Sequence, residues 1–320
     1  LGDVYKRQML VLPVSDRLKG NIRGDMIAFQ LIVNTLVTVS VLFPLALGFA
    51  LFYRINGFIH FSHALVYAAG AYGAYLAFNA PYLPFAASFL GAVLTALCVG
   101  ASIECFCYRP LRHRRASPLA LFLASLGLYV LGQNTISLLF GETARSIRGY
   151  HVNPGSDVLG ATITHGQTIG IALAFTGATL FWFILGRTRL GTKLRACAQS
   201  RDLAAICGIN TDTYLLFSAL MGSALAGLAA FITVLDSDVN PTMGLSPLIY
   251  AIVAAMIGGS SRVGGIAAAS FSVAAVRTCS SWILGSRWEQ PLLLIVLLGF
   301  LLLRAHPLQS RGTIGEIVGN

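Results

Sequence analysis

Apolar stretches of bilayer length alternate with short polar segments along most of the chain. A helix needs about 20 apolar residues to cross the hydrocarbon core of a membrane. We therefore expect an all-α polytopic membrane bundle with about eight to ten crossings. The pattern predicts helices over residues 28–52, 57–78, 84–107, 119–140, 167–185, 214–235, 247–258, 266–284 and 290–304.

Two of these helices have irregular sequences. The stretch 247–258 is too short to cross a bilayer straight, and a glycine-rich turn follows it. The stretch 57–78 begins with histidines and a serine behind a glycine. Irregular backbone is tolerated at membrane depth only where protein or a water-filled cavity covers it. We expect one or two broken helices, with the breaks at Gly57, Gly258, Gly259, Gly264 and Gly265.

Composition supports an integral membrane protein made of one domain. Only 11% of the residues are charged, whereas a soluble domain has about 25%. We expect a tail over 1–26, a transmembrane domain over 27–304 and a cytoplasmic tail over 305–320. Residues 1–8 precede the first methionine and read as non-native.

The net charge of +10 is distributed as a membrane protein requires. Basic residues gather in loops 108–118 and 186–213, whereas loops 141–166 and 236–246 are balanced or acidic. The positive-inside rule places the two basic loops in the cytoplasm, and nucleic-acid binding is not expected. The side of the N-terminus stays open, because counting crossings puts it outside and the charges near it weakly favour the inside.

The longest polar interruption, 186–213, contains a predicted amphipathic helix. Its apolar residues recur at helical spacing and it ends near Gly208: Leu194, Cys197, Leu203, Ile206 and Cys207. An apolar stripe on a surface helix needs a partner to cover it. The alternative is an ordinary basic loop on the inner side of the membrane.

Several polar residues fall inside the predicted helices. Asn34, Gln133 and Asn134 either line a pathway or hold helices together. His60, Ser62 and His63 either line a pathway or satisfy backbone groups at the helix break, and we expect no metal there.

Two charged residues also lie within predicted helices. We expect Glu104 to pair with Arg109 near the inner end of its helix. Arg277 lies midway along 266–284, where a lone cation is costly. It either marks a pathway facing the bundle or lies on an offset helix that carries it to an interface, and the second is favoured.

Four stretches, spread over residues 29–304, form recognisable motifs. The first is GFIHFSH, beginning at Gly57 and continuing to Gly70-Ala71-Tyr72. The second combines SLGL, from Ser125, with Gln133-Asn134 and Phe140-Gly141. The third, from Arg195 to Asp212, includes RACA and GINTD, and the fourth joins Asn240-Pro241 and Gly244 to Gly258-Gly259. In this order and at these spacings, the four stretches resemble the branched-chain amino acid permeases of ABC importers, the LivH-like family.

The third stretch also resembles the loop through which such permeases engage their ATPase. The resemblance implies a coupling role for Arg195, Asp202, Ala204, Gly208 and Asn210. The small side chains of Ala204 and Ala205 would allow close approach to the ATPase.

The partners implied are ABC ATPase subunits, a second permease subunit, a periplasmic or extracellular solute-binding protein and membrane lipids. The chain itself needs no cofactor, since Thr192-Lys193 reverses the order that an ATP-binding P-loop requires.

The resemblance implies a bacterial inner-membrane transport subunit rather than an enzyme. It would take up branched-chain or other apolar amino acids by alternating access, driven by separate ATPase subunits. Urea or short amides are the alternative substrates within the family. A secondary transporter would need intramembrane carboxylates, and an intramembrane enzyme a nucleophile with a base, for which the sequence offers little.

Overall fold

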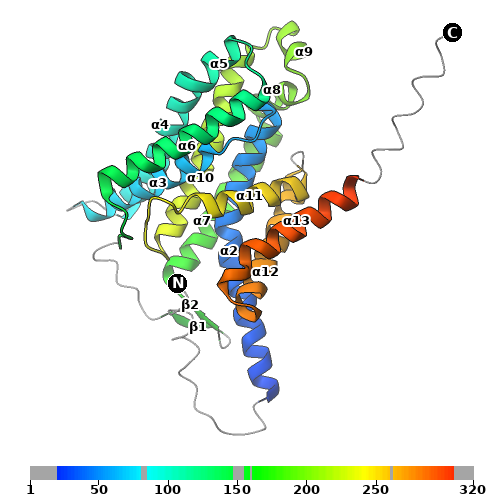
Figure 1. Cartoon of the computed structure of the whole chain (residues 1–320). Coiled ribbons are helices and arrows are strands. Elements are labelled where there is room, and N and C mark those ends of the chain that lie inside the picture. The colour runs from blue at the N-terminus through cyan, green and yellow to red at the C-terminus, as the bar shows by residue number, and fades with distance from the viewer. Residues whose placement is uncertain (1–19, 81–84, 147–154, 159–160, 260–261, 306–320) are drawn as a thin grey trace, which may run out of the picture.

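The computed structural model describes residues 20–80, 85–146, 155–158, 161–259 and 262–305. Within them the chain is a bundle of helices, which confirms the predicted all-α membrane class (Figure 1). The tail before Gly20 and the tail after Ala305 lie outside the described residues.

The helices follow the predicted apolar runs closely. They are α2 (Gly20–Asn56), α3 (Ser62–Asn79), α4 (Phe85–Ile103), a π-helix η2 (Glu104–Tyr108), α5 (Arg109–His113), α6 (Pro118–Phe140), α7 (His165–Arg187), α8 (Arg189–Gln199), α9 (Arg201–Ile206), α10 (Thr211–Val234), α11 (Leu245–Gly258), α12 (Val263–Ile283), a 3₁₀ turn η3 (Ser286–Trp288) and α13 (Glu289–Ala305). A small hairpin joins β1 (Ser156–Val158) to β2 (Ala161–Ile163).

Helices α2 and α10 form the centre of the bundle. The most apolar windows of these two spans are 67% and 72% buried. They approach closely because both carry glycine at the crossing, and a Cβ on Gly48 would lie 2.8 Å from the Gly222 carbonyl oxygen. Without a hydrophobic effect between helices in lipid, such close backbone packing supplies much of the association energy.

Helices α4, α6 and α7 lie at the outside of the bundle. Within the described residues, six helices are long and apolar enough to cross a membrane, and these three are among them. Their apolar windows are only 22–28% buried. Large apolar side chains such as Leu138 and Phe175 are exposed on α6 and α7. These faces therefore suit lipid or another subunit rather than water.

The two ends of α2 lie at opposite ends of the bundle. Near its start, Gln30 accepts a hydrogen bond from the Thr162 amide at 3.0 Å, next to the hairpin. At its end, the Ile55 carbonyl accepts a hydrogen bond from Arg201 Nε at 2.9 Å. Because Arg201 belongs to a basic loop, the positive-inside rule places the start of α2 on the outer side. This rule therefore favours the orientation that counting crossings gives over the one that the charges near the N-terminus weakly favour.

The C-terminal helices include the short one that the sequence predicts. Helix α11 begins inside the bundle, where Gly244 packs against the Ala64 backbone in the first turn of α3. It ends at a turn where Gly258 and Gly265 pack backbone to backbone. Its 14 residues therefore cover only part of the bilayer thickness.

Candidate functional site

The break between α2 and α3 positions a buried polar cluster. Gly57 adopts φ +76°, which a residue with a side chain rarely adopts, and it ends α2. Behind the break, the rings of His60 and His63 lie 4.9 Å apart between centroids and are almost fully buried. The Ser62 hydroxyl lies 2.5 Å from the Tyr108 hydroxyl on η2. The three predicted residues of this segment thus share one site in the interior of the chain.

Two nitrogens of this cluster have no hydrogen-bond partner among the described residues: His60 Nδ1 and His63 Nε2. They line a cavity of about 10 Å³ together with Glu104 and Ser223. That volume admits about one water molecule and excludes an amino acid. Within the described residues no group of three potential metal ligands comes together. The cluster therefore has room for a bridging water rather than for a transported solute.

An ionic network lies between this cluster and the inner end of the bundle. Glu104, buried at the start of η2, forms an ion pair with Arg112 of α5. Arg112 Nη1 also donates to the Asn56 side-chain oxygen at 3.2 Å, and Asn56 Nδ2 donates to the Ser218 hydroxyl at 3.1 Å. The network joins the ends of α2, α5 and α10.

The expected pairing of Glu104 with Arg109 is wrong. The π-helix η2 carries one extra residue per turn and changes the phase of the side chains that follow it. Arg109 is consequently exposed and lies 3.9 Å from the carboxylate of Asp212, which His113 also approaches.

The polar loop 186–213 forms two helices instead of the one predicted. Ser200 has an extended backbone, ends α8 and caps α9 by accepting the Leu203 amide. The predicted apolar stripe is divided accordingly. Leu194 and Cys197 of α8 are buried within the chain, whereas Leu203 and Ile206 of α9 are 64% and 82% exposed.

The end of α9 has the geometry of a helix stop. Gly208 adopts φ +80°, and the Ile209 amide donates to the Ala204 carbonyl at 3.0 Å. Asn210 then caps α10 by accepting the Thr213 amide. Ala204 is buried within its own chain, whereas Ala205 and Asp202 are exposed.

Arg201 connects α9 to the membrane helices. Its guanidinium donates to the Ile55 carbonyl in the last turn of α2. Burial is the main cause that lowers the pKa of this guanidinium, and the positive charge of Arg112 lowers the pKa further. An arginine nonetheless stays charged at neutral pH. A charged hydrogen bond therefore holds α9 to the residues that precede the helix break.

The remaining predicted pathway residues lie elsewhere. Asn34 accepts a hydrogen bond from Gln30 at 3.0 Å, near the outer hairpin. On α6, Asn134 is exposed and bonds the Val130 carbonyl of its own helix, and Gln133 is half-buried. The structure does not bring these residues to His60 and His63.

The glycines expected at helix breaks differ in what they do. Gly57 and Gly259 have positive φ, at +76° and +73°. Gly258 and Gly265 permit the close approach of α11 and α12. Gly264 has open space where a side chain would lie.

Arg277, whose environment the sequence left open, contacts Glu289 of α13 at 2.9 Å and lies over the ring of Tyr250.

The described residues thus form a polytopic helical bundle with six candidate membrane spans, and its basic loop carries a short helix with an exposed apolar face. The chain belongs to the family described as branched-chain amino acid transport system, permease component, whose model matches residues 31–303. This membership confirms the resemblance seen in the sequence.

Curated relatives agree with this assignment, and a solved structure shares the fold. The chain is 28% identical over 271 residues to LivH, a high-affinity branched-chain amino acid transport permease of Salmonella typhimurium, covering 79% of this chain and 87% of LivH. It is 28% identical over 305 residues to BraD of Pseudomonas aeruginosa, covering 90% and 97%. PsaBC from Streptococcus pneumoniae has the same fold, with a TM-score of 0.51 at 16% identity over 88% of this chain and 94% of that one.

Proposed function

We propose that this chain is the permease subunit of an ABC importer for branched-chain or other apolar amino acids in a bacterial inner membrane. ATPase subunits would seat α9, a second permease subunit would complete the pathway, and a solute-binding protein would deliver the substrate from outside. The relatives named above support the substrate class. ATP would be bound and hydrolysed by the partner, and alternating access would follow from its motion.

One observation carries this proposal: the exposed apolar face of α9, formed by Leu203 and Ile206 on the basic side of the bundle. Exposed side chains of this size on an aqueous face need a partner surface. Arg201 holds α9 to the last turn of α2, directly before the break that leads to His60 and His63. A displacement of α9 would therefore move the end of α2 through the hydrogen bonds between Arg201 and the Ile55 carbonyl.

The buried charges argue against a secondary transporter. Such a protein couples to an ion gradient through intramembrane carboxylates that bind and release the ion. Among the side chains that the structure describes, Glu104 is the fully buried acidic residue, at 2% exposure, and it is neutralised by Arg112. Glu289 is likewise paired, with Arg277.

Reconstitution tests the proposal. The chain is co-expressed with an ATPase, a second permease and a solute-binding protein of the branched-chain amino acid type, and uptake of labelled leucine into proteoliposomes is measured with ATP. We expect ATP-dependent uptake that excess isoleucine inhibits and excess urea does not. Inhibition by urea alone would assign the short-amide alternative, and uptake without the ATPase would refute the importer assignment.

The variant Gly208→Pro tests the coupling role. Proline cannot adopt φ +80° and removes the amide that donates to the Ala205 carbonyl at 2.9 Å. We expect ATP hydrolysis to continue and uptake to fall to background. Gly141→Pro is the matched control, because Gly141 has φ +81° and its amide donates to the Ser137 carbonyl, but it lies at the end of α6 that leads to the outer hairpin. Normal uptake by Gly208→Pro would refute the coupling assignment.

A further inference from the structure

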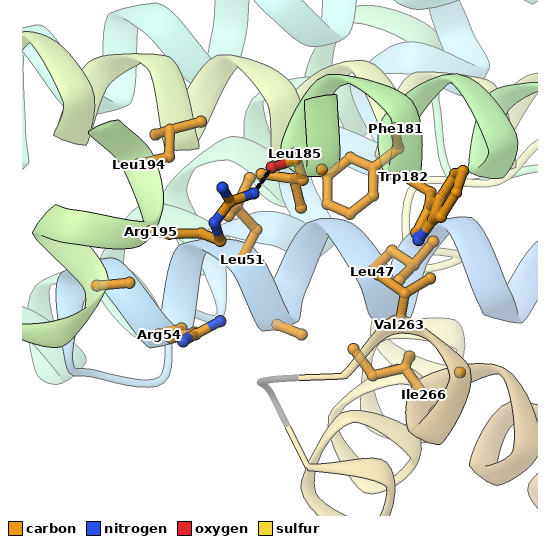
Figure 2. Close-up of a pocket in the computed structure, with 14 residues that line it drawn as sticks. Leu47, Leu51, Arg54, Phe181, Trp182, Leu185, Leu194, Arg195, Val263 and Ile266 are labelled. Atoms are coloured by element: carbon orange, nitrogen blue, oxygen red, sulfur yellow. Dashed lines mark hydrogen bonds between the residues drawn. The ribbon is translucent and has the colours of Figure 1, made fainter. Parts of the chain in front are cut away.

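A second cavity lies at the inner ends of four helices, away from the histidine cluster. It has a volume of about 250 Å³ and is bounded by α2, α7, α8 and the start of α12 (Figure 2). Its walls are apolar and include Leu47, Leu51, Phe181 and Ile266. The volume is smaller than the 300–1,000 Å³ typical of pockets that enclose a whole small-molecule ligand.

Two arginines lie at one end of this cavity, and Trp182 lies at the other (Figure 2). Arg54 comes from the last turn of α2 and Arg195 from α8. Arg195 donates to the Leu185 carbonyl and to the Thr192 hydroxyl, and neither of these is an anion. In the described part of the chain no carboxylate pairs with either guanidinium.

The position of the cavity fits the inner leaflet of a bilayer. The arginines lie on the basic side of the bundle, which the positive-inside rule assigns to the cytoplasm. Trp182 is 53% exposed on α7, at the end of the cavity remote from the arginines. Tryptophan is enriched at this depth because its ring is apolar and its N–H group is polar.

We propose that this cavity binds one anionic phospholipid of the inner leaflet. Its headgroup phosphate would lie between Arg54 and Arg195, and the first part of an acyl chain would lie along the apolar wall beside Trp182. Guanidinium groups bind phosphate oxygens with paired hydrogen bonds. Basic pockets between membrane helices on the cytoplasmic side recognise such headgroups.

The chemistry favours a lipid over the other occupants considered. A free phosphate ion would leave the apolar wall uncovered, and a purely apolar partner surface would bury two guanidinium groups without an anion. The lipid would bridge α2 to α8, the helix that precedes α9. The occupied site would therefore brace the part of the loop that we propose to move with the ATPase.

Fluorescence quenching by brominated lipids tests this site. The chain contains three tryptophans, so Trp282→Phe/Trp288→Phe leaves Trp182 as the only one. This variant is reconstituted with brominated phosphatidylglycerol or brominated phosphatidylcholine in mixtures with unlabelled phosphatidylcholine. Each basic residue near an anionic lipid contributes about a fivefold preference. We expect phosphatidylglycerol to quench Trp182 with at least that preference.

Charge variants separate the site from general attraction to a basic surface. In the same background, Arg54→Gln/Arg195→Gln should lose the preference, and Arg54→Lys/Arg195→Lys should keep most of it. Arg189→Gln is the matched control, since Arg189 is exposed on the same face and does not line the cavity. Arg54→Gln alone should lower the preference by about fivefold, and it leaves the Arg195 contacts in place.

Three results would overturn the proposal. Equal quenching by the two lipids would show no headgroup selection. An unchanged preference in Arg54→Gln/Arg195→Gln, or an equal loss in Arg189→Gln, would place the selection outside the cavity. Loss of quenching by both lipids when the ATPase or second permease binds would show that a subunit covers the cavity.

Discussion

At the scale of single residues, the Glu104–Arg112 pair is the contact most sensitive to substitution. The side chains of Arg112 and Glu104 are 12% and 2% exposed, so removing one leaves a charge with little solvent. We predict that Glu104→Gln destabilises the protein by about 3 kcal/mol, which a thermal-unfolding assay in detergent would record as a clear drop in midpoint. Glu104→Gln/Arg112→Met should recover most of the loss, and a double variant as unstable as the single one would contradict this account.

The cysteines of the polar loop offer a second test at this scale. Cys207, directly after α9, is exposed, whereas Cys197 is buried in α8. Burial raises the pKa of the Cys197 thiol, which leaves less of the reactive thiolate at neutral pH. In a chain where Cys98, Cys105, Cys107 and Cys279 are replaced by serine, we predict that a membrane-impermeant maleimide labels inside-out vesicles, and that the further change Cys207→Ser abolishes the labelling. Binding of the ATPase should protect Cys207, and full labelling in the assembled transporter would place the ATPase elsewhere.

At the scale of elements, α9 is the helix that we expect to bind the ATPase. Burial of a large apolar side chain stabilises a contact by about 1.5–3 kcal/mol. We therefore predict that Leu203→Asp/Ile206→Asp weakens co-purification with the ATPase by about a hundredfold or more. The conservative pair Leu203→Met/Ile206→Val should retain the ATPase. Retention by the aspartate variant would show that the exposed face of α9 is not the contact.

The helices themselves could be predicted from hydrophobic runs, because a span of about 20 apolar residues has few other stable states in a bilayer. The division of loop 186–213 was missed, although Ser200 followed by Asp202 is a recognisable start of a helix. No residue pattern around Glu104 predicts the π-helix, whose formation depends on how η2 packs against its neighbours. For the same reason, residue spacing alone paired Glu104 with the wrong arginine.

The polar residues inside the helices show more clearly how much of the site can be predicted from the sequence. Their presence could be read from the sequence, but their grouping depends on helix rotation and depth. His60 and His63 share a cavity because the break places His60 directly before α3 and His63 in the first turn of α3. Asn34 and Gln133 both carry amide side chains and lie in similarly apolar stretches of sequence. In the bundle, however, Asn34 lies near the outer hairpin and Gln133 lies on the half-buried surface of α6.

At the scale of the whole molecule, the path of α2 fixes the orientation of the bundle. Its start is tied to Thr162 beside the hairpin and its end to Arg201 in a basic loop. Before loop 108–118, α2 and α4 are long and apolar enough to cross a membrane, and the shorter α3 lies between them. With this orientation, the basic residues of the two later loops must outweigh the charges near the N-terminus, and charges later in a chain can set its topology.

Cysteine accessibility tests this orientation directly. In a chain whose six cysteines are replaced by serine, single cysteines are introduced as Ile27→Cys, Thr162→Cys or Lys193→Cys. We predict that an impermeant maleimide added to right-side-out vesicles labels the first two, because the start of α2 and the hairpin face outward. Lys193→Cys should react only after the vesicles are opened, because α8 lies on the basic side. Labelling of Thr162→Cys without Ile27→Cys would contradict the hydrogen bonds that join Gln30 to Thr162 and would reverse the path of α2.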